Sequence, residues 1–349
     1  MIRFDSDYMA GAHPEVLDAL VRTNLELTVG YGNDPYTAEA RRLICRAIEN
    51  ANAEIMFLVG GTQTNATVID GVLARHEGVL AAESGHIAVH ESGAIEASGH
   101  KVLTLPHHEG KVVAGDVEHF ITEFYSDETY QHMVAPGMLY ISQPTEYGTL
   151  YSLEELKSLS EVCHKHDIPL YIDGARLGYA LCAPNTDFKL ADLARLADIF
   201  YIGGTKVGTL FGEAVVVNNR SLLKNLFPLV KQHGALLAKG RLLGVQFATL
   251  FRDGLYERIG SHGVRLAMRL REIFGKAGYE PIIASTTNQQ FFRLPNTLID
   301  DLRREASFDY WGPRGDKESI VRFVTSWSTT DEDIDRLEAL LGRSSATEV

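Results

Sequence analysis

Two charged side chains follow short apolar runs that are typical of buried strands. Asp173 closes the run IPLYI at 168–172, and Lys206 follows the run FYI at 200–202 after Gly-Gly-Thr. In an open parallel sheet, the carboxyl ends of the strands border the crevice where ligands bind. We therefore expect Asp173 and Lys206 to lie in one active-site crevice.

A lysine and a carboxylate at successive strand ends indicate a pyridoxal phosphate site. The Lys206 amine can hold the cofactor aldehyde as a Schiff base, and the Asp173 carboxylate can keep the pyridine nitrogen protonated so that the ring accepts electrons. Burial would raise the pKa of Asp173 unless a cation such as that pyridine compensates, and it would lower the pKa of Lys206. An N-cap or an ion pair with Arg176 is the alternative role for Asp173.

The segment VGGTQTN at 59–65 follows a predicted strand and opens a predicted helix. Its glycines let the backbone approach a ligand closely, and the free amides of a helix N-terminus face an anion. A phosphate would fit there, and a plain glycine turn with a threonine N-cap is the structural alternative. The spacing is that of neither a P-loop nor a GxGxxG fingerprint, which weakens a nucleotide interpretation.

His86 lies just past another apolar run, in the segment ESGHI at 83–87. Its flat ring could stack on a planar cofactor. With His90 it also forms an HxxxH spacing that could bind a metal on a helix. Glycines flank this pair and no third ligand has a recognisable spacing, so we expect no metal site.

Composition favours a globular enzyme that acts on small molecules. The 349 residues are 45% hydrophobic, which is ample for one large and one smaller domain. A net charge of −13, with 33 basic and 46 acidic residues, argues against a general affinity for nucleic acid or anionic membranes. The amino terminus lacks a signal-peptide pattern and no long uncharged apolar stretch follows, so we expect a cytoplasmic protein that spans no membrane. Three widely spaced cysteines predict neither disulfides nor a zinc cluster.

Apolar runs alternate with helical patterns through the first 250 or so residues, which predicts a mostly parallel sheet covered on both faces. The predicted strands are 54–59, 78–82, 102–105, 138–142, 168–173, 198–202 and 213–217, and the clearest helices are 14–24, 36–51, 64–76, 153–166, 220–231 and 235–252.

The pattern changes after about residue 255. A helix near 261–278 precedes strand-like pieces at 281–284, 290–294 and 320–325 and a last helix from Asp331 to Leu341, while Gly342 to Val349 looks like a disordered polar tail. We therefore expect an N-terminal segment (1–12), a large cofactor-binding domain (13–254) and a smaller C-terminal α+β domain (255–349).

With these motifs in order, the chain resembles the fold-type-I pyridoxal-phosphate enzymes, and more narrowly the threonine aldolase and β-eliminating lyase family. The resemblance runs from Asp5-Ser6-Asp7, similar to the family's amino-terminal Ser-Asp motif, to the strand RFVTSW at 322–327. It implies a fold-type-I transferase-like α/β fold in which Lys206 is the Schiff-base lysine, Asp173 the pyridine-nitrogen partner and His86 the ring-stacking histidine. Gly61 and Thr62 would bind the phosphate.

The resemblance also implies a substrate site and a subunit interface. Arg176 of the DGAR motif and Arg322 would hold a substrate carboxylate, because guanidinium groups suit carboxylates, and Ser6 would also bind the substrate. Lys224 and Lys231 look like the basic residues that the family places near the phosphate from a neighbouring subunit, although the pattern expects Arg where Lys231 stands. The implied assembly is a homo-oligomer, a dimer or tetramer with active sites at the subunit interface.

The expected reaction is retro-aldol cleavage of a β-hydroxy-α-amino acid, threonine or allo-threonine, to glycine and an aldehyde. Glu146 stands where the family usually has a histidine thought to contact the substrate hydroxyl, and a loop-capping or subunit-pairing role is its alternative. A β-eliminating lyase or aminotransferase of the same fold would use the same Lys206 and Asp173. A cofactor-binding homologue without turnover is the non-enzymatic alternative.

Overall fold

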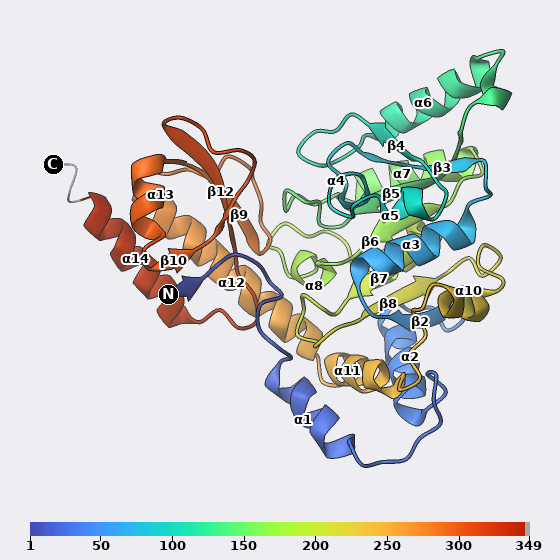
Figure 1. Ribbon diagram of the computed structural model, residues 1–349, viewed down its shortest axis with the longest axis horizontal. Coiled ribbons are helices and arrows are strands. Elements are labelled where there is room, and N and C mark those ends of the chain that lie inside the picture. The colour runs from blue at the N-terminus through green and yellow to red at the C-terminus, as the bar shows by residue number, and fades with distance from the viewer. Residues whose placement is uncertain (346–349) are drawn as a thin grey trace.

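A seven-stranded mixed sheet forms the centre of the larger part of the molecule, within the described residues 1–345 of this computed structural model (Figure 1). Four neighbouring pairs are parallel, and β8 runs antiparallel to both β2 and β7. The mostly parallel sheet predicted from the sequence is confirmed. In spatial order the strands are β2 (Glu54–Leu58), β8 (Glu213–Val217), β7 (Ile199–Gly203), β6 (Leu170–Asp173), β5 (Ala135–Ser142), β3 (Glu77–Ala82) and β4 (Val102–Leu105).

Helices cover both faces of this sheet because successive strand residues are buried on opposite sides. Phe57 and Ile172 belong to one core cluster, whereas their neighbours Leu58 and Tyr171 belong to another. The first face is covered by α1 (Pro14–Thr23), α2 (Pro35–Ala47), α6 (Ala114–Ser126), α7 (Leu153–Lys165), α8 (Leu177–Ala180), α9 (Leu190–Leu196) and α11 (Arg241–Arg252). The second is covered by α3 (Gly61–Val72), α4 (His86–Val89), α5 (Ala94–Ala97) and α10 (Leu226–Gln232), and a 3-10 turn, η1 (Tyr130–His132), precedes β5.

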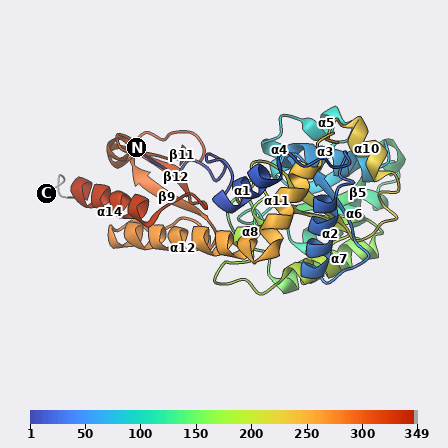
Figure 2. The same cartoon turned by 90° about the horizontal axis from the view of Figure 1, so that it is seen from below.

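The C-terminal part packs around a third core cluster and is reached through the long helix α12 (Leu255–Lys276), as Figures 1 and 2 show. Its antiparallel sheet has the order β11-β12-β9. The amino terminus joins this part, because β1 (Ile2–Arg3) pairs in parallel with β10 (Ala306–Ser307). The other elements are β9 (Gln289–Pro295), α13 (Asn296–Leu302), β11 (Asp309–Tyr310), β12 (Glu318–Val324) and α14 (Asp331–Ser345).

Several predicted element bounds were wrong. The helix predicted at 220–231 begins only at Leu226, because the Asn219 side chain accepts hydrogen bonds from the Ser221 amide and hydroxyl and holds a turn. The helix predicted at 235–252 begins at Arg241, since the carbonyl of Ala238 is taken by the amide of Tyr31.

Three further predictions in the C-terminal part also needed correction. The piece at 281–284 is no strand and keeps one isolated bridge, Pro281 with Phe292. Helix α12 begins at Leu255 rather than near 261. Helix α14 extends through Gly342 to Ser345, so this much of the predicted tail is helical, while 346–349 lie outside the described residues. None of the helices in the described part of the chain combines the length and apolar character needed to cross a bilayer.

Candidate active site

A cavity of about 100 Å³ opens at the carboxyl ends of the parallel strands, where the sequence placed its catalytic candidates. Its lining includes Gly61, His86, Glu146, Asp173, Arg176 and Lys206. A second cavity of about 500 Å³ shares His86, Glu146, Arg176 and Lys206 with the first and extends to Arg322 and Trp311 of the C-terminal part. The site therefore lies between the large sheet and the C-terminal part.

Asp173 ends β6 as a buried carboxylate with four hydrogen-bond donors. Its Oδ1 accepts from the Tyr201 hydroxyl at 2.5 Å and the Ala175 amide at 3.0 Å. Its Oδ2 accepts from the Tyr140 hydroxyl at 2.7 Å and the Asn65 side chain at 3.1 Å. Burial alone would raise the pKa of Asp173, but the charge of His86 and the tyrosine donors outweigh it and lower this pKa. The carboxylate is therefore held ionised.

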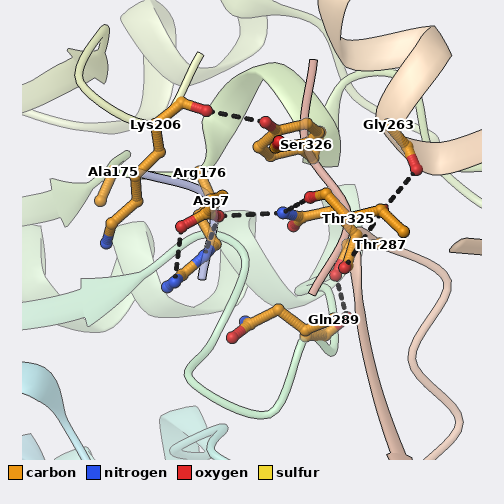
Figure 3. Close-up of polar contacts among 12 residues, drawn as sticks. Asp7, Ala175, Arg176, Lys206, Gly263, Thr287, Gln289, Thr325 and Ser326 are labelled. Atoms are coloured by element: carbon orange, nitrogen blue, oxygen red, sulfur yellow. Dashed lines mark hydrogen bonds and ion pairs between the residues drawn. The ribbon is translucent and has the colours of Figure 1, made fainter. Parts of the chain in front are cut away.

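Lys206 follows β7 in a tight loop and is partly buried. Its backbone carbonyl accepts from the Tyr179 hydroxyl at 2.7 Å, which fixes the loop against α8. Figure 3 shows the side chains of Lys206 and Arg176 extending toward the same side of the site. Burial, followed by the positive charge of Arg176, lowers the pKa of the Lys206 amine. A lowered pKa increases the fraction of neutral amine, the form that attacks an aldehyde.

The amino end of α3 forms a cradle with free backbone donors. Its N-cap is Gly60, which supplies no side-chain cap, and the first internal hydrogen bond is made by the amide of Thr64 to Gly60. A side chain at Gly61 would meet the Tyr201 hydroxyl at 3.3 Å, so glycine keeps the helix end open to the cavity. Thr62 is exposed and lies outside the cavity lining. Free amides at the end of a 12-residue helix fit a phosphate group.

His86 begins α4 and is oriented by a carboxylate that the sequence analysis missed. Its Nδ1 lies 2.7 Å from Oε1 of Glu91, whose side chain is fully buried. That oxygen also accepts from the Asn65 side chain at 2.8 Å, and Asn65 in turn donates to Asp173. The predicted stacking residue and the predicted pyridine partner thus share one hydrogen-bonded network. The nearest signal in the sequence was the HxxxH spacing of His86 and His90, which suggested a metal pair and gave no role to Glu91.

Glu146 lies in the loop after β5 and contacts the His86 segment directly. Its Oε1 accepts from the Ser142 hydroxyl at 2.7 Å and from the backbone amide of His86 at 2.9 Å. Burial raises the pKa of Glu146, and the Ser142 hydrogen bond opposes the rise only in part. A buried carboxyl group with a raised pKa can act as a proton acceptor or donor.

The two predicted carboxylate-binding arginines come from different parts of the fold. Arg176 forms a bidentate ion pair with buried Asp7, at 2.7 and 3.1 Å (Figure 3). Arg322 on β12 pairs with Asp309 at 2.7 Å, while its buried Nε has no hydrogen-bond partner in the described structure. That donor suits a substrate oxygen. Ser6 precedes Asp7 but is absent from the linings of both cavities as described.

Lys224 and Lys231 are exposed and lie outside the described lining of this site. The Lys231 amine lies 4.8 Å from the centre of the Tyr31 ring. Neither lysine therefore serves the cavity of its own chain, which leaves the predicted contact with a neighbouring subunit as a prediction.

Similarity to known proteins now adds to this geometry. Residues 3–297 match the beta-eliminating lyase family. The chain belongs to this family. Enzymes of the family depend on pyridoxal phosphate, and the free amides of α3, the ionised Asp173 and the Lys206 amine fit that cofactor.

Curated relatives and solved structures match over nearly the whole chain. The low specificity L-threonine aldolases of Pseudomonas sp. (strain NCIMB 10558) and Pseudomonas aeruginosa are 28% and 29% identical, over 97% of this chain and 96% and 95% of theirs. The solved Leishmania major threonine aldolase is 41% identical, with a TM-score of 0.96 over 99% of this chain and 100% of that one. The histidinol-phosphate aminotransferase of Clostridium acetobutylicum, at 13% identity and a TM-score of 0.74, supports the fold-type-I architecture alone.

Proposed function

We propose that this protein is a pyridoxal-phosphate-dependent threonine aldolase, which cleaves threonine or allo-threonine to glycine and acetaldehyde. The observation that carries the proposal is the convergence of Lys206, Asp173, His86 and the α3 amides on one cavity. The threonine aldolases of Leishmania major and Pseudomonas, similar over nearly the whole chain, support this substrate class.

Each end of the cofactor has a matching group in this chain. The amides of Gly61 and Thr62 would hold the phosphate, Asp173 would hold the protonated pyridine nitrogen and His86 would cover the ring. The Lys206 amine would hold the cofactor aldehyde. When bound, pyridoxal phosphate supplies an electron sink for the Cα–Cβ bond that breaks.

The arginines orient the substrate for this bond cleavage. Arg176, fixed by Asp7, and Arg322, with its free Nε, bind the carboxylate. Holding the carboxylate would fix the rotation about the substrate Cα and so determine which bond at Cα is oriented for cleavage. The geometry of the bound substrate thus selects which bond breaks.

Glu146 takes the proton of the substrate hydroxyl as the aldehyde leaves. It lines both cavities beside His86 and Lys206, so it faces the space in which the substrate side chain extends. Its raised pKa makes the ionised form a stronger base than an ordinary carboxylate. Ser142 and the His86 amide keep the carboxylate in place.

The remaining proposals concern assembly and compartment. The protein forms a homo-oligomer, dimer or tetramer, in which Lys224 and Lys231 approach the phosphate of a neighbouring subunit. It acts in the cytoplasm. We also propose the division into 1–12, 13–254 and 255–349 as structural units. The separate core cluster that runs from Leu266 to Leu341 supports the C-terminal unit, and it also includes Ile2 and Phe4 of the N-terminal segment.

A glycine-release assay over β-hydroxy-α-amino acids tests the proposed reaction. Threonine or allo-threonine should yield glycine and acetaldehyde in equal amounts, whereas a keto acid with ammonia or a transferred amine would favour the β-eliminating or aminotransferase alternative. Lys206→Ala should abolish glycine release and the covalent cofactor link together. Lys239→Ala is the matched control that keeps both. A reduced cofactor adduct mapped by mass spectrometry to another lysine would overturn the Lys206 assignment.

A further inference from the structure

Glu213 is a buried carboxyl group in the active-site cavity to which the proposed reaction gives no task. It is the first residue of β8, is 3% exposed and lines the same cavity as Gly61 and Lys206. A buried acid requires a partner or a proton, because burial of an isolated carboxylate is costly. Its position therefore requires a physical explanation.

The sheet places Glu213 between the two segments that would hold the cofactor. In the antiparallel ladders its Cα faces Leu58 of β2 on one side and Gly203 of β7 on the other. Strand β2 leads within three residues to Gly61 at the amino end of α3. Strand β7 leads within three residues to Lys206. Glu213 thus lies beside the free amides at the amino end of α3 and next to the start of the loop that carries Lys206.

The hydrogen bonds of Glu213 come from the lysine loop. Its Oε2 accepts from the Gly204 amide at 3.1 Å, and the Thr205 hydroxyl also hydrogen-bonds to the carboxyl group. Burial is the largest influence on its pKa, which rises to about 8 even with these donors and the charge of Lys206. Glu213 accordingly carries a proton at neutral pH. Five titratable groups in the described part of the chain interact with the Glu213 charge. They are Asp173 and Tyr171 on β6, Tyr201 on β7, Lys206 in the loop after β7, and Tyr256 on α12.

The protonation state decides what Glu213 does beside a phosphate. An ionised carboxylate next to a phosphate dianion would repel it, whereas a protonated carboxyl group can donate a hydrogen bond to a phosphate oxygen. We propose that Glu213 holds its proton in the working enzyme and donates it as a hydrogen bond to the cofactor phosphate at the amino end of α3. This inference rests on the proposed cofactor. If Glu213 donates this hydrogen bond, phosphate binding should weaken as Glu213 ionises.

Phosphorus-31 NMR of the holoenzyme reads this hydrogen bond without reference to activity. Between about pH 6 and pH 9.5 the bound-phosphate resonance should shift with one inflection near pH 8, where Glu213 loses its proton. In Glu213→Gln, which keeps an N–H donor but cannot ionise, the resonance should not move over this range. Glu146→Gln, a change at another carboxyl group with a raised pKa in the same cavity, is the matched control and should keep the wild-type inflection.

Cofactor release provides a second measurement that does not depend on the variants. Wild-type holoenzyme should release cofactor roughly tenfold faster at alkaline pH than at neutral pH, since one hydrogen bond to a charged group is lost. A flat phosphorus titration of wild type, or an inflection that persists in Glu213→Gln, would overturn the assignment of Glu213 while leaving the proposed function intact. A protein that carries no bound phosphate after incubation with pyridoxal phosphate would overturn both.

Discussion

At the scale of single residues, two carboxyl groups of one cavity have pKa values that shift in opposite directions. Burial raises the pKa of both Asp173 and Glu146. Asp173 is compensated by the charge of His86 and two tyrosine hydroxyls, so its pKa is lowered overall. Glu146 is less fully compensated by Ser142 and keeps a raised pKa. Such a separation lets one group remain a fixed negative charge while the other exchanges a proton.

Replacing Glu146 tests this difference directly. Because its pKa is raised, the ionised base is lost as pH falls through a value above the ordinary 4.5, and kcat should decline on that acidic limb. Glu146→Gln should lower kcat roughly 100-fold at neutral pH and remove the limb, while the covalent cofactor link is retained. The measurement is kcat against pH on threonine and allo-threonine. Equal rates with an unchanged acidic limb would exclude Glu146 from proton transfer.

At the scale of elements, the sequence predicted helices best where a capping residue marks the start. The helices that begin after Asp34 and Ser152 were found, and both residues accept a hydrogen bond from the first turn. The unpredicted helices α6, α9 and α13 begin after Val113, Lys189 and Pro295, which are not the Ser, Thr, Asp or Asn residues that usually mark a start. The buried strands of the large sheet were found from their continuous apolar runs, whereas two-residue strands such as β1 and β10 carry no periodic signal.

The same limit applies to the site. Asp173, Lys206, Gly61 and His86 could be grouped from the sequence because each follows a predicted strand, and parallel strands converge at their carboxyl ends. Their supporting partners could not. Asp7 lies 169 residues from Arg176 along the chain, and contacts of this kind depend on tertiary packing rather than on local spacing.

Strand β12 carries Arg322, the arginine that links the C-terminal part to the site. Its role in substrate binding can be tested separately from cofactor binding. Arg322→Ala should lower kcat/KM at least about 10-fold, because a charge-assisted carboxylate contact is worth roughly 1.5–3 kcal/mol. Cofactor content should remain unchanged. Arg293 is an exposed residue of β9, the strand that pairs with β12, so Arg293→Ala is the control and should keep normal kinetics. If Arg322→Ala kept wild-type kcat/KM, Arg176 would suffice to hold the substrate.

At the scale of the whole molecule, the first residues of the chain connect both parts. The amide of Phe4 donates to the carbonyl of Ser307 in the C-terminal part at 2.8 Å, while Asp7 binds Arg176 in the large part. Asp7 also accepts from the Asn288 side chain at 2.9 Å. Burial raises the pKa of Asp7, but Arg176 and Lys206 outweigh it and lower that pKa overall. The N-terminal segment therefore fixes the substrate arginine relative to both parts of the fold.

We predict that the segment between α1 and α2 lies at the interface between subunits. This segment runs along the edge of the molecule (Figure 1), and its alternate residues Leu25, Leu27 and Val29 are 91%, 101% and 68% exposed. An apolar row of this kind is typical of an interface. Leu27→Glu should reduce the oligomer size measured by light scattering, because a charge is costly at a buried contact. Val113→Glu, at an exposed apolar residue outside this segment, should leave the size unchanged, and an identical oligomer in both variants would move the interface elsewhere.

The raised pKa of Glu213 predicts how the stability of the whole fold depends on pH. Its pKa is about 8 in the folded chain against an ordinary 4.5, so between these values the folded chain keeps a proton that the unfolded chain has released. Stability then falls as pH rises, by about 1.4 kcal/mol per pH unit from this group. Because Gln cannot titrate, Glu213→Gln should gain in urea midpoint relative to wild type between about pH 5 and pH 8.

Glu155→Gln is the matched control for this titration, since the pKa of Glu155 is lowered in the folded chain. Glu155 pairs with Lys111 at 2.6 Å and is ionised in both folded and unfolded chains above about pH 5. Its difference in midpoint from wild type should therefore stay constant over the range in which the Glu213→Gln difference grows. A constant difference for Glu213→Gln as well would mean that Glu213 is already ionised in the folded protein, and its hydrogen bond to phosphate would then lack a proton to donate.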